Sequence, residues 1–405
     1  MKICMLSRSM PIHSVGGMQD HILSLCQELI NLNHEVTVIS TRHPKGKTYE
    51  NIDKIHVYYL DNTIPILESK SYRIESLKLL IDLQNRLGKF DIIHSQGYCG
   101  LHLLNYKKIL SSPLIISLHG TYMDEIKTFR NEVFATLNPK ITFNALLRLV
   151  YYSYLHFSWA LPNTRKFNKI IVTSNEQKKL VENIYAVKDN NLKVVYNGID
   201  TNLFSSGFTD SGLRIKLGIS KEQKVILAVA RLVFQKGIQY IILALPDIIK
   251  HNPSIKLVIV GDGKYGKNLK QLVKRLKIDD TVIFVGAVSP ELLPMYYGLC
   301  DIFVNPTIRI NGYDLSILQA MASTKPVVAS NIGSVPTLIT DGIDGLLVPL
   351  WNKKALVNQV QRVLQDEILA NNIGKAAQKK VFDKFNSKSM ALETVKIYEE
   401  AIADN

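Results

Sequence analysis

The fold is decided by one stretch of thirty residues, DIFVNPTIRINGYDLSILQAMASTKPVVAS (301–330). It reads as an apolar strand, a polar loop, a helix that begins near Asp314, and a second apolar strand. A short strand that is apolar at nearly every position is buried on both faces, and such strands joined through a helix are typical of a parallel sheet. The stretch therefore predicts one strand–helix–strand unit of an α/β fold.

The same unit recurs in two series along the chain. Short apolar stretches of the first series lie at 2–7, 35–40, 55–60, 91–96, 114–119, 169–174 and 192–197, and those of the second at 225–230, 256–261, 282–287, 301–306, 326–330 and 345–349. Helical patterns separate most of them, which predicts two doubly wound, Rossmann-like sheets. Because ligands of such sheets bind at the carboxyl ends of the strands, we look for chemistry immediately after each strand.

The two series are separated by a stretch rich in Gly, Ser, Asn and Asp, YNGIDTNLFSSGFTDSG (196–212), whose composition is typical of a hinge. A chain of 405 residues is also too long for one ordinary core. We predict an N-terminal domain at 1–197 and a C-terminal domain at 198–385 that face each other across a cleft. The remaining residues, 386–405, are predicted to form a helix that returns to the N-terminal domain.

The composition is that of an ordinary globular protein, with 46% apolar and 21% charged residues. No uncharged apolar run reaches roughly 18 residues, and the opening MKICMLSRSM reads as a first strand rather than a signal peptide. The four cysteines are scattered, which predicts neither a zinc site nor a disulfide framework. We expect a cytoplasmic protein, with the inner face of the membrane as an alternative location.

The net charge of +14 suits a nucleic acid, an anionic membrane or a phosphorylated substrate. No zinc-finger, RNP-like or basic-helix pattern is present, so we expect no nucleic-acid partner. An aromatic-rich segment at 141–162 is flanked by Lys140, Arg165, Lys166 and Lys169. This segment either makes a peripheral membrane contact or covers the sheet before the strand at 169–174.

Glycine, histidine and cationic residues follow several of the strands. Gly17 opens the first helix, and His119 stands at the end of the strand at 114–119. Arg231 ends the strand at 225–230, and Lys236 lies where the next helix begins. Two cations at a helix start suit a diphosphate. A histidine at a strand end faces the cleft and can exchange a proton, but taken alone it is more often a capping or core residue.

Three further features follow strands of the second series. VGDG (260–263) and VGAVSPE (285–291) are glycine-containing turns that suit backbone contacts to a base. The helix that begins near Asp314 has unpaired N–H groups at its start, which bind phosphate readily.

Taken together, these stretches resemble the family 4 retaining glycosyltransferases, group 1 glycosyl transferases with the GT-B fold. The resemblance runs through GGMQDHILSLCQELINLNHEVTVIS, HG, VTSNEQKK, VVYNGID, VARLVFQKG, LVIVGDG, VIFVGAV, LQAMASTKPVVAS and DGIDGLLVP. It implies that Arg231 and Lys236 hold a donor diphosphate, that Gly17 lies in the loop that closes on it, and that His119 contacts the transferred sugar. It further implies base contacts from Gly286 and Val288, and phosphate contacts from Gly312, Tyr313, Asp314 and Leu315.

The chain departs from the family pattern at two positions. Asn311 and Gln319 stand where the family holds two glutamates, of which the first contacts the donor sugar and the second the ribose. Gln319 can still bond a ribose hydroxyl, at a loss of about 1 kcal/mol relative to a charged partner. Asn311 supplies only a dipole beside the reacting carbon. Asp314 either caps the helix or supplies the missing negative charge.

Two functions follow from this pattern. In the first, the chain is a hexosyltransferase that moves a sugar from a UDP- or GDP-linked donor to a hydroxyl of a glycan or lipid-linked glycan, with retention of configuration and without a cofactor or metal. In the second, it is a catalytically silent relative that binds a nucleotide sugar or supports another enzyme. The retained cations favour the first function and the two amides favour the second.

Overall fold

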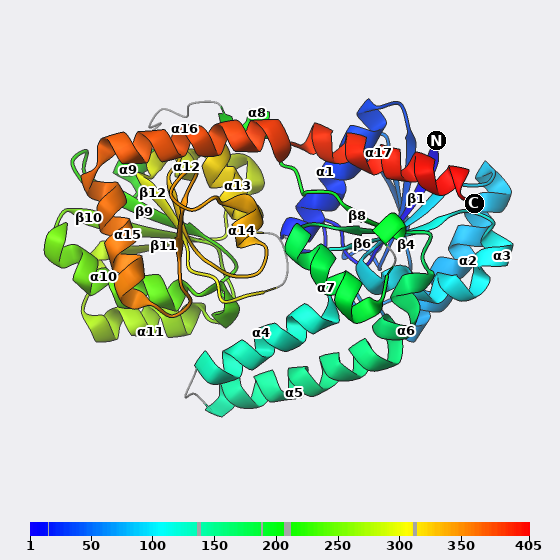
Figure 1. Ribbon diagram of the computed structural model, residues 1–405, viewed down its shortest axis with the longest axis horizontal. Coiled ribbons are helices and arrows are strands. Elements are labelled where there is room, and N and C mark those ends of the chain that lie inside the picture. The colour runs from blue at the N-terminus through cyan, green and yellow to red at the C-terminus, as the bar shows by residue number, and fades with distance from the viewer. Residues whose placement is uncertain (15, 136–138, 188, 206–211, 311–313) are drawn as a thin grey trace. The chain divides into compact units, whose positions relative to one another are not determined.

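The computed structural model describes residues 1–405 except 15, 136–138, 188, 206–211 and 311–313, and it leaves the side chains of 135, 139–141 and 189 undescribed. The chain forms two compact units (Figure 1). The first comprises Met1–Ile126, Leu147–Gly198 and Ser387–Asn405, and the second comprises Lys127–Leu146 and Ile199–Asn386. The sequence predicted domain ends at 197 and 385. It placed residues 127–146 in the first domain, whereas the structure groups them with the second unit.

The first unit is built on a sheet of eight strands in the order β3-β4-β2-β1-β5-β6-β7-β8, counted over the described residues. All neighbouring strands pair in parallel except β3 and β4. The strands are β1 Lys2–Ser7, β2 Glu35–Ser40, β3 Tyr49–Ile52, β4 Ile55–Tyr59, β5 Ile92–Gln96, β6 Leu114–Leu118, β7 Lys169–Val172 and β8 Leu192–Val194.

Helices cover both faces of this sheet, as the apolar strands require. Along β1, Ile3 and Met5 join one core while Cys4 and Leu6 join the other. The helices α1 (Gly17–Asn31) and α17 (Ser387–Ala403) pack on the first face, and α2 (Lys70–Leu87) and α7 (Asn175–Tyr185) pack on the second (Figure 1).

A buried hydrogen-bonded histidine attaches α17 to the sheet. His94 on β5 is fully buried, with Nδ1 2.6 Å from the Tyr398 hydroxyl and Nε2 2.8 Å from Ser117 Oγ. Burial lowers the pKa of His94 to about 3, so the ring is neutral at pH 7. The C-terminal helix is thereby fixed to the middle of the first sheet.

The second unit contains a fully parallel sheet of six strands in the order β11-β10-β9-β12-β13-β14, again over the described residues. Its strands are β9 Lys224–Val229, β10 Ile255–Val260, β11 Val282–Gly286, β12 Ile302–Asn305, β13 Val327–Ser330 and β14 Leu346–Val348. The chain runs outward from β9 to β11 and then returns to the other side of β9. The strand order therefore reverses between β9 and β12, where ligands of such sheets bind.

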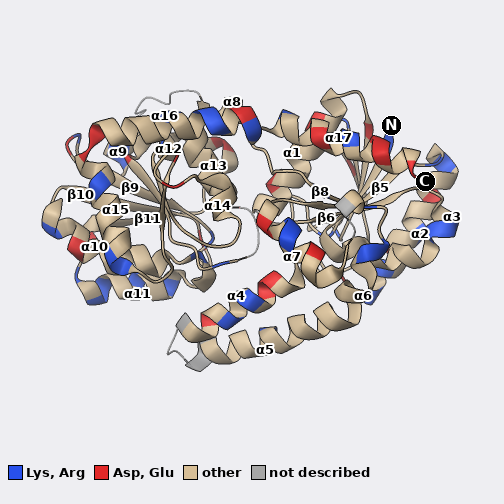
Figure 2. Ribbon diagram, viewed as in Figure 1, with Lys and Arg blue, Asp and Glu red and all other residues tan. Residues whose placement is uncertain are grey.

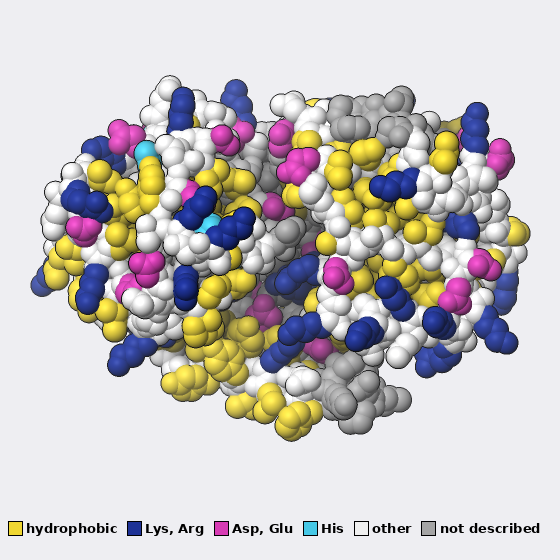
Figure 3. Space-filling view, turned by 180° about the vertical axis from the view of Figure 1, so that it is seen from behind, with side chains coloured by type: hydrophobic (Ala, Val, Ile, Leu, Met, Phe, Trp, Pro, Cys, Tyr) yellow, Lys and Arg dark blue, Asp and Glu magenta, His cyan; other side chains and the backbone are white. Residues whose placement is uncertain are grey.

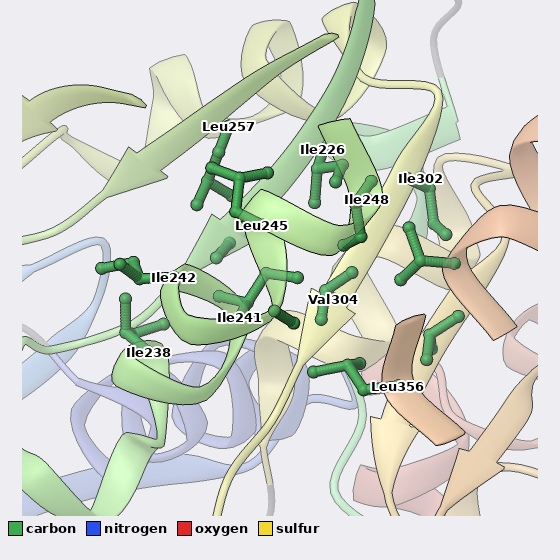
Figure 4. Packing of buried hydrophobic residues seen from close by; sticks show 14 of the residues in the cluster. Ile226, Ile238, Ile241, Ile242, Leu245, Ile248, Leu257, Ile302, Val304 and Leu356 are labelled. Atoms are coloured by element: carbon green, nitrogen blue, oxygen red, sulfur yellow. The ribbon is translucent and has the colours of Figure 1, made fainter. Parts of the chain in front are cut away.

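Aliphatic side chains from one face of this sheet and four helices form a continuous core. Ile241, Leu245 and Ile248 of α10 (Ile238–His251) point toward Ile226, Leu257 and Val304 of the strands, and Leu356 of α15 (Lys353–Gln365) closes the group (Figure 4). The other two helices of this core are α11 (Gly266–Leu276) and α16 (Glu367–Lys384). The remaining helices of the unit are α8 Thr201–Ser205, α9 Leu213–Lys216, α12 Leu293–Leu299, α13 Leu315–Ala322 and α14 Val335–Leu338.

The remaining helices are short or lie where the two units divide. They are α3 Lys107–Leu110, α4 Tyr122–Ala135, α5 Pro139–Leu155 and α6 Leu161–Asn163. None of the helices in the described parts of the chain is both long and apolar enough to cross a membrane.

Gly237 brings the loops after β9 and β12 into contact. Its φ is +73°, and a Cβ built on it would lie 1.8 Å from the carbonyl oxygen of Pro306. No other residue type both accepts this backbone conformation readily and leaves room for that oxygen.

Replacing Gly237 with alanine is expected to lower the free energy of unfolding by about 3 kcal/mol or more, because the Pro306 carbonyl must move and the backbone is strained. Gly342→Ala is the matched control, since Gly342 has φ +76° but nothing within 4 Å of a built Cβ. It should cost only about 1 kcal/mol. Scanning calorimetry compares the two variants, and equal losses would show that the close approach carries no cost.

A second prediction concerns acid stability. Because the pKa of His94 is near 3 in the folded chain and near 6.5 when unfolded, the unfolded state binds the extra proton between these values. The contribution of His94 to the free energy of unfolding therefore falls as the pH is lowered from about 6.5 toward 3. His94→Gln should be less stable than the wild type at pH 7, and the gap should narrow on acidification. Urea midpoints measured from pH 7 to pH 4 check this, and a constant gap would contradict it.

Candidate functional site

The main candidate site lies at the point of strand reversal in the second unit. After β9, a turn of 3-10 helix at Phe234–Lys236 precedes Gly237. The loop after β12 is tied to this turn, because Ile308 N and Thr307 Oγ1 both donate to the carbonyl oxygen of Gln235, at 3.0 and 3.2 Å. Lys236 therefore stands on a backbone held from two strands.

The ammonium group of Lys236 is in a partly buried ion pair. Lys236 Nζ contacts Asp314 Oδ1, and the two side chains are only 12% and 13% exposed. Asn305 Nδ2 at the end of β12 donates to Asp314 Oδ2 at 3.1 Å. The predicted residues Lys236 and Asp314 are thus brought together, and Asn305 completes a group at the carboxyl ends of β9 and β12.

Two arginines add positive potential to this group. Burial lowers the pKa of Lys236 against the opposing effect of Asp314, and Arg309 and Arg231 lower it further. Burial alone would raise the pKa of Asp314, but Lys236, Arg309 and Asn305 outweigh it and hold that pKa below its usual value. Lys236 and Arg309 therefore both act on one carboxylate, and Arg231 adds positive potential at Lys236, so the edge of the sheet attracts anions.

Of the two roles predicted for Asp314, the side-chain cap of the helix is wrong. Its backbone carbonyl accepts from Ile317 N at 2.9 Å, but its carboxylate makes no capping hydrogen bond to α13. The carboxylate turns to Lys236 and Asn305 instead, because a buried ammonium without a partner is more costly than an unpaired helix N–H near solvent. Leu315, the first residue of α13, is buried in the unit.

Gln319 contacts a neighbouring helix. Its Oε1 accepts a hydrogen bond of 2.9 Å from the hydroxyl of Tyr297, which is fully buried on α12. An amide satisfies this hydroxyl without placing a carboxylate in an apolar region. Gln319, at the position where the family holds a glutamate, is therefore hydrogen-bonded within its own unit.

The glycine-containing turns after β10 and β11 are also held tightly. A Cβ on Gly261 would lie 2.0 Å from the Ala230 carbonyl oxygen, and Gly261 N donates to Gly286 O at 2.8 Å. Gly286 has φ +87°, and Val288, two residues on, is half-buried. These turns adjoin the segment that carries Arg231, an exposed residue.

A second polar group lies at the carboxyl ends of the strands in the first unit. His119 Nε2 is 2.8 Å from Gln96 Oε1 at the end of β5. The rings of His21 and His119 pack edge to face, with their centroids 4.5 Å apart. Burial lowers the pKa of His119 to about 4, so the ring is neutral at pH 7. Both nitrogens of the buried His21 lack a hydrogen-bond partner among the described residues.

The other predicted residues are placed as follows. Gly17 begins α1 and is exposed, in the same unit as His119. Asn311, Gly312 and Tyr313 lie outside the described residues. Among the described residues, no group of three or more His, Cys, Asp or Glu could hold a metal ion.

Sequence reasoning missed four residues of these groups, namely Asn305, Arg309, His21 and Gln96. Asn305 and Gln96 end strands, so the rule that chemistry follows strands would have found them. Arg309 is in a loop, and His21 reads as an ordinary helical residue, so neither carries a local signal.

Comparison with known proteins gives the chain its relatives. A model of Glycosyltransferase Family 4 matches residues 15–203, and a model of Glycosyl transferases group 1 matches residues 211–380. An uncharacterized glycosyltransferase of Methanocaldococcus jannaschii is 29% identical, with 99% of each chain covered. The alpha-monoglucosyldiacylglycerol synthase of Streptococcus pneumoniae is 28% identical over 82% of this chain and 72% of its own.

The fold has solved counterparts. The structure of Anabaena HepE in complex with UDP and glucose has a TM-score of 0.78 and 21% identity, covering 99% of this chain and all of that chain. This match confirms the predicted two-sheet α/β architecture with C-terminal helices. The matches favour a transferase over the silent relative. Because the two family models follow each other along nearly the whole chain, the protein belongs to the family 4, group 1 glycosyltransferases of GT-B fold.

Proposed function

We propose that this glycosyltransferase transfers a hexose from a UDP- or GDP-linked donor to a hydroxyl of a glycan or lipid-linked acceptor, with retention of configuration and without a bound metal. The observation that carries the proposal is the ammonium of Lys236, held at the strand reversal beside Arg309 and Arg231. The relative that synthesises a monoglucosyldiacylglycerol supports the transfer of a sugar to a lipid. The fold neighbour with UDP and glucose supports a uridine nucleotide as donor.

The proposed role of the cations is to stabilise the leaving diphosphate. As the bond from the anomeric carbon to the phosphate oxygen breaks, negative charge grows on that oxygen, and fixed positive groups lower the barrier. Lys236, Arg231 and Arg309 lie where they can supply these groups, in place of a metal ion. Asp314 balances part of this positive charge.

Retention follows if attack occurs on the face from which the donor leaves. The acceptor oxygen then forms its bond to the anomeric carbon on that same face, and its proton passes to the departing phosphate oxygen. No protein base is required for this transfer, which is compatible with Asn311 where the family has a glutamate. We assign sugar orientation to Asn311 and His119, and a ribose contact to the amide nitrogen of Gln319.

The proposed role of Lys236 is tested by removing its charge without leaving a buried ion unpaired. Lys236→Met alone should destabilise the chain by about 3–5 kcal/mol, because Asp314 then loses its partner. Lys236→Met with Asp314→Asn removes both charges and should regain much of that stability. The double variant is expected to release nucleoside diphosphate from UDP- and GDP-sugars at least about 10–100-fold more slowly, since a charge-assisted bond is worth about 1.5–3 kcal/mol.

Lys267→Met is the matched control, because Lys267 is an exposed cation on α11 of the same unit. It should leave both stability and turnover near the wild-type values. If the stable double variant turned over within threefold of the wild type, Lys236 would not be part of the diphosphate site.

A further inference from the structure

The helix α5 and the turn of π-helix that continues it, at His156–Ala160, are attached to the first unit by one side. The Tyr152 ring lies 5.7 Å from the Tyr122 ring, centroid to centroid, and His156 Nδ1 lies 3.2 Å from the Tyr185 hydroxyl. Ala160 is fully buried. The inward side of the segment therefore packs on the first unit, which is one of the two roles predicted for residues 141–162.

The opposite side of the segment is apolar and exposed. Its members recur at spacings of three and four residues, which places them in one row along a helix. We call them the α5 stripe: Leu147, Val150, Tyr151, Tyr154 and Phe157, each more than half exposed, with Val150 at 70% and Tyr154 at 68%. Figure 3 shows hydrophobic side chains gathered along the lower edge of the molecule, where α5 runs.

The stripe cannot be explained as scattered surface residues. Single exposed apolar side chains are ordinary, but a continuous row of five on one helix marks an interaction surface. Phe143 and Leu146, earlier in α5, are exposed by 62% and 45% and extend the same row. Figure 2 shows α5 almost without charged residues, in contrast to the alternating charges of α4.

The charges around the stripe indicate what covers it. No Asp or Glu occurs between Glu132 and Glu176, whereas the five cations there are Lys140, Arg148, Arg165, Lys166 and Lys169. Arg148, Arg165 and Lys166 are exposed. Lys169 is buried and paired with Asp404 at 2.9 Å, so it is not part of this surface. An apolar row with tyrosines, whose own stretch of sequence carries cations and no acidic residue, is complementary to an anionic lipid surface.

We propose that the α5 stripe inserts into the headgroup region of a bilayer that contains anionic phospholipid, with the helix lying along the surface and the flanking cations on the headgroups. The inference does not depend on the proposed donor or reaction. It places the first unit on the surface where a lipid-linked hydroxyl would be found.

The test measures flotation of the full chain with vesicles. Wild-type protein should float with vesicles of equal parts phosphatidylcholine and phosphatidylglycerol and much less with phosphatidylcholine alone. Val150→Asp with Tyr154→Asp should lower the partition coefficient about tenfold or more, because two apolar groups no longer leave water. The matched control is Ile215→Asp with Ile368→Asp, at residues of the second unit that are 86% and 76% exposed. It should float like the wild type.

A charge variant and a size measurement complete the test. Arg165→Gln with Lys166→Gln should reduce binding to the anionic vesicles by about fivefold for each cation removed. Melting curves of all variants should match the wild type, since every altered side chain is exposed. Absence of wild-type flotation, or equal flotation of the stripe variant, would overturn the proposal. So would a dimer seen by light scattering that the stripe substitutions abolish, because the stripe would then cover a second copy.

Discussion

The absence of a side chain at Gly237 is the constraint on which the candidate site of the second unit depends. Its backbone approaches the Pro306 carbonyl so closely that no Cβ fits, and the loops after β9 and β12 are consequently held together. Lys236 comes from the first of these loops and Arg309 from the second, and Asn305 is the last residue of β12. A group of charges that are far apart in the sequence is therefore assembled by one steric requirement at the strand reversal of the sheet.

The contacts around this group bear on Asp314 and Gln319. Lys236 is partly buried and needs an anion, and Asp314 provides one. A further carboxylate at 319 would face the buried Tyr297 hydroxyl, whereas the amide of Gln319 accepts the same hydrogen bond without a charge. Asp314 carries the local negative charge and stands directly beside the cations.

Most of the strands could be predicted from the sequence, because a parallel strand buried on both faces leaves a nearly continuous apolar run. The antiparallel edge strand β3 was missed, since YENI (49–52) has no such run. The helix predicted at 386–405 is α17, and the interruption between α15 and α16 falls at Asp366, whose side chain caps α16.

The site was only partly predictable for a different physical reason. Lys236 and Asp314 were found because their positions relative to strand and helix ends are local features. Their ion pair joins residues far apart in the chain, so the sequence alone left two roles open for Asp314, a helix cap and a source of negative charge. The exposure of the α5 stripe likewise depends on which side of a uniformly apolar helix packs inward, and the pattern of residues does not determine that choice.

The central claim is that the charges at the strand reversal bind the diphosphate of a nucleotide-sugar donor. Isothermal titration of the wild-type chain with nucleoside, nucleoside monophosphate and nucleoside diphosphate, in a uridine and a guanosine series, tests it most directly. The account predicts that in one series each added phosphate tightens binding about tenfold or more, because each gains charge-assisted contacts. Equal affinities for the nucleoside and its diphosphate in both series would contradict it.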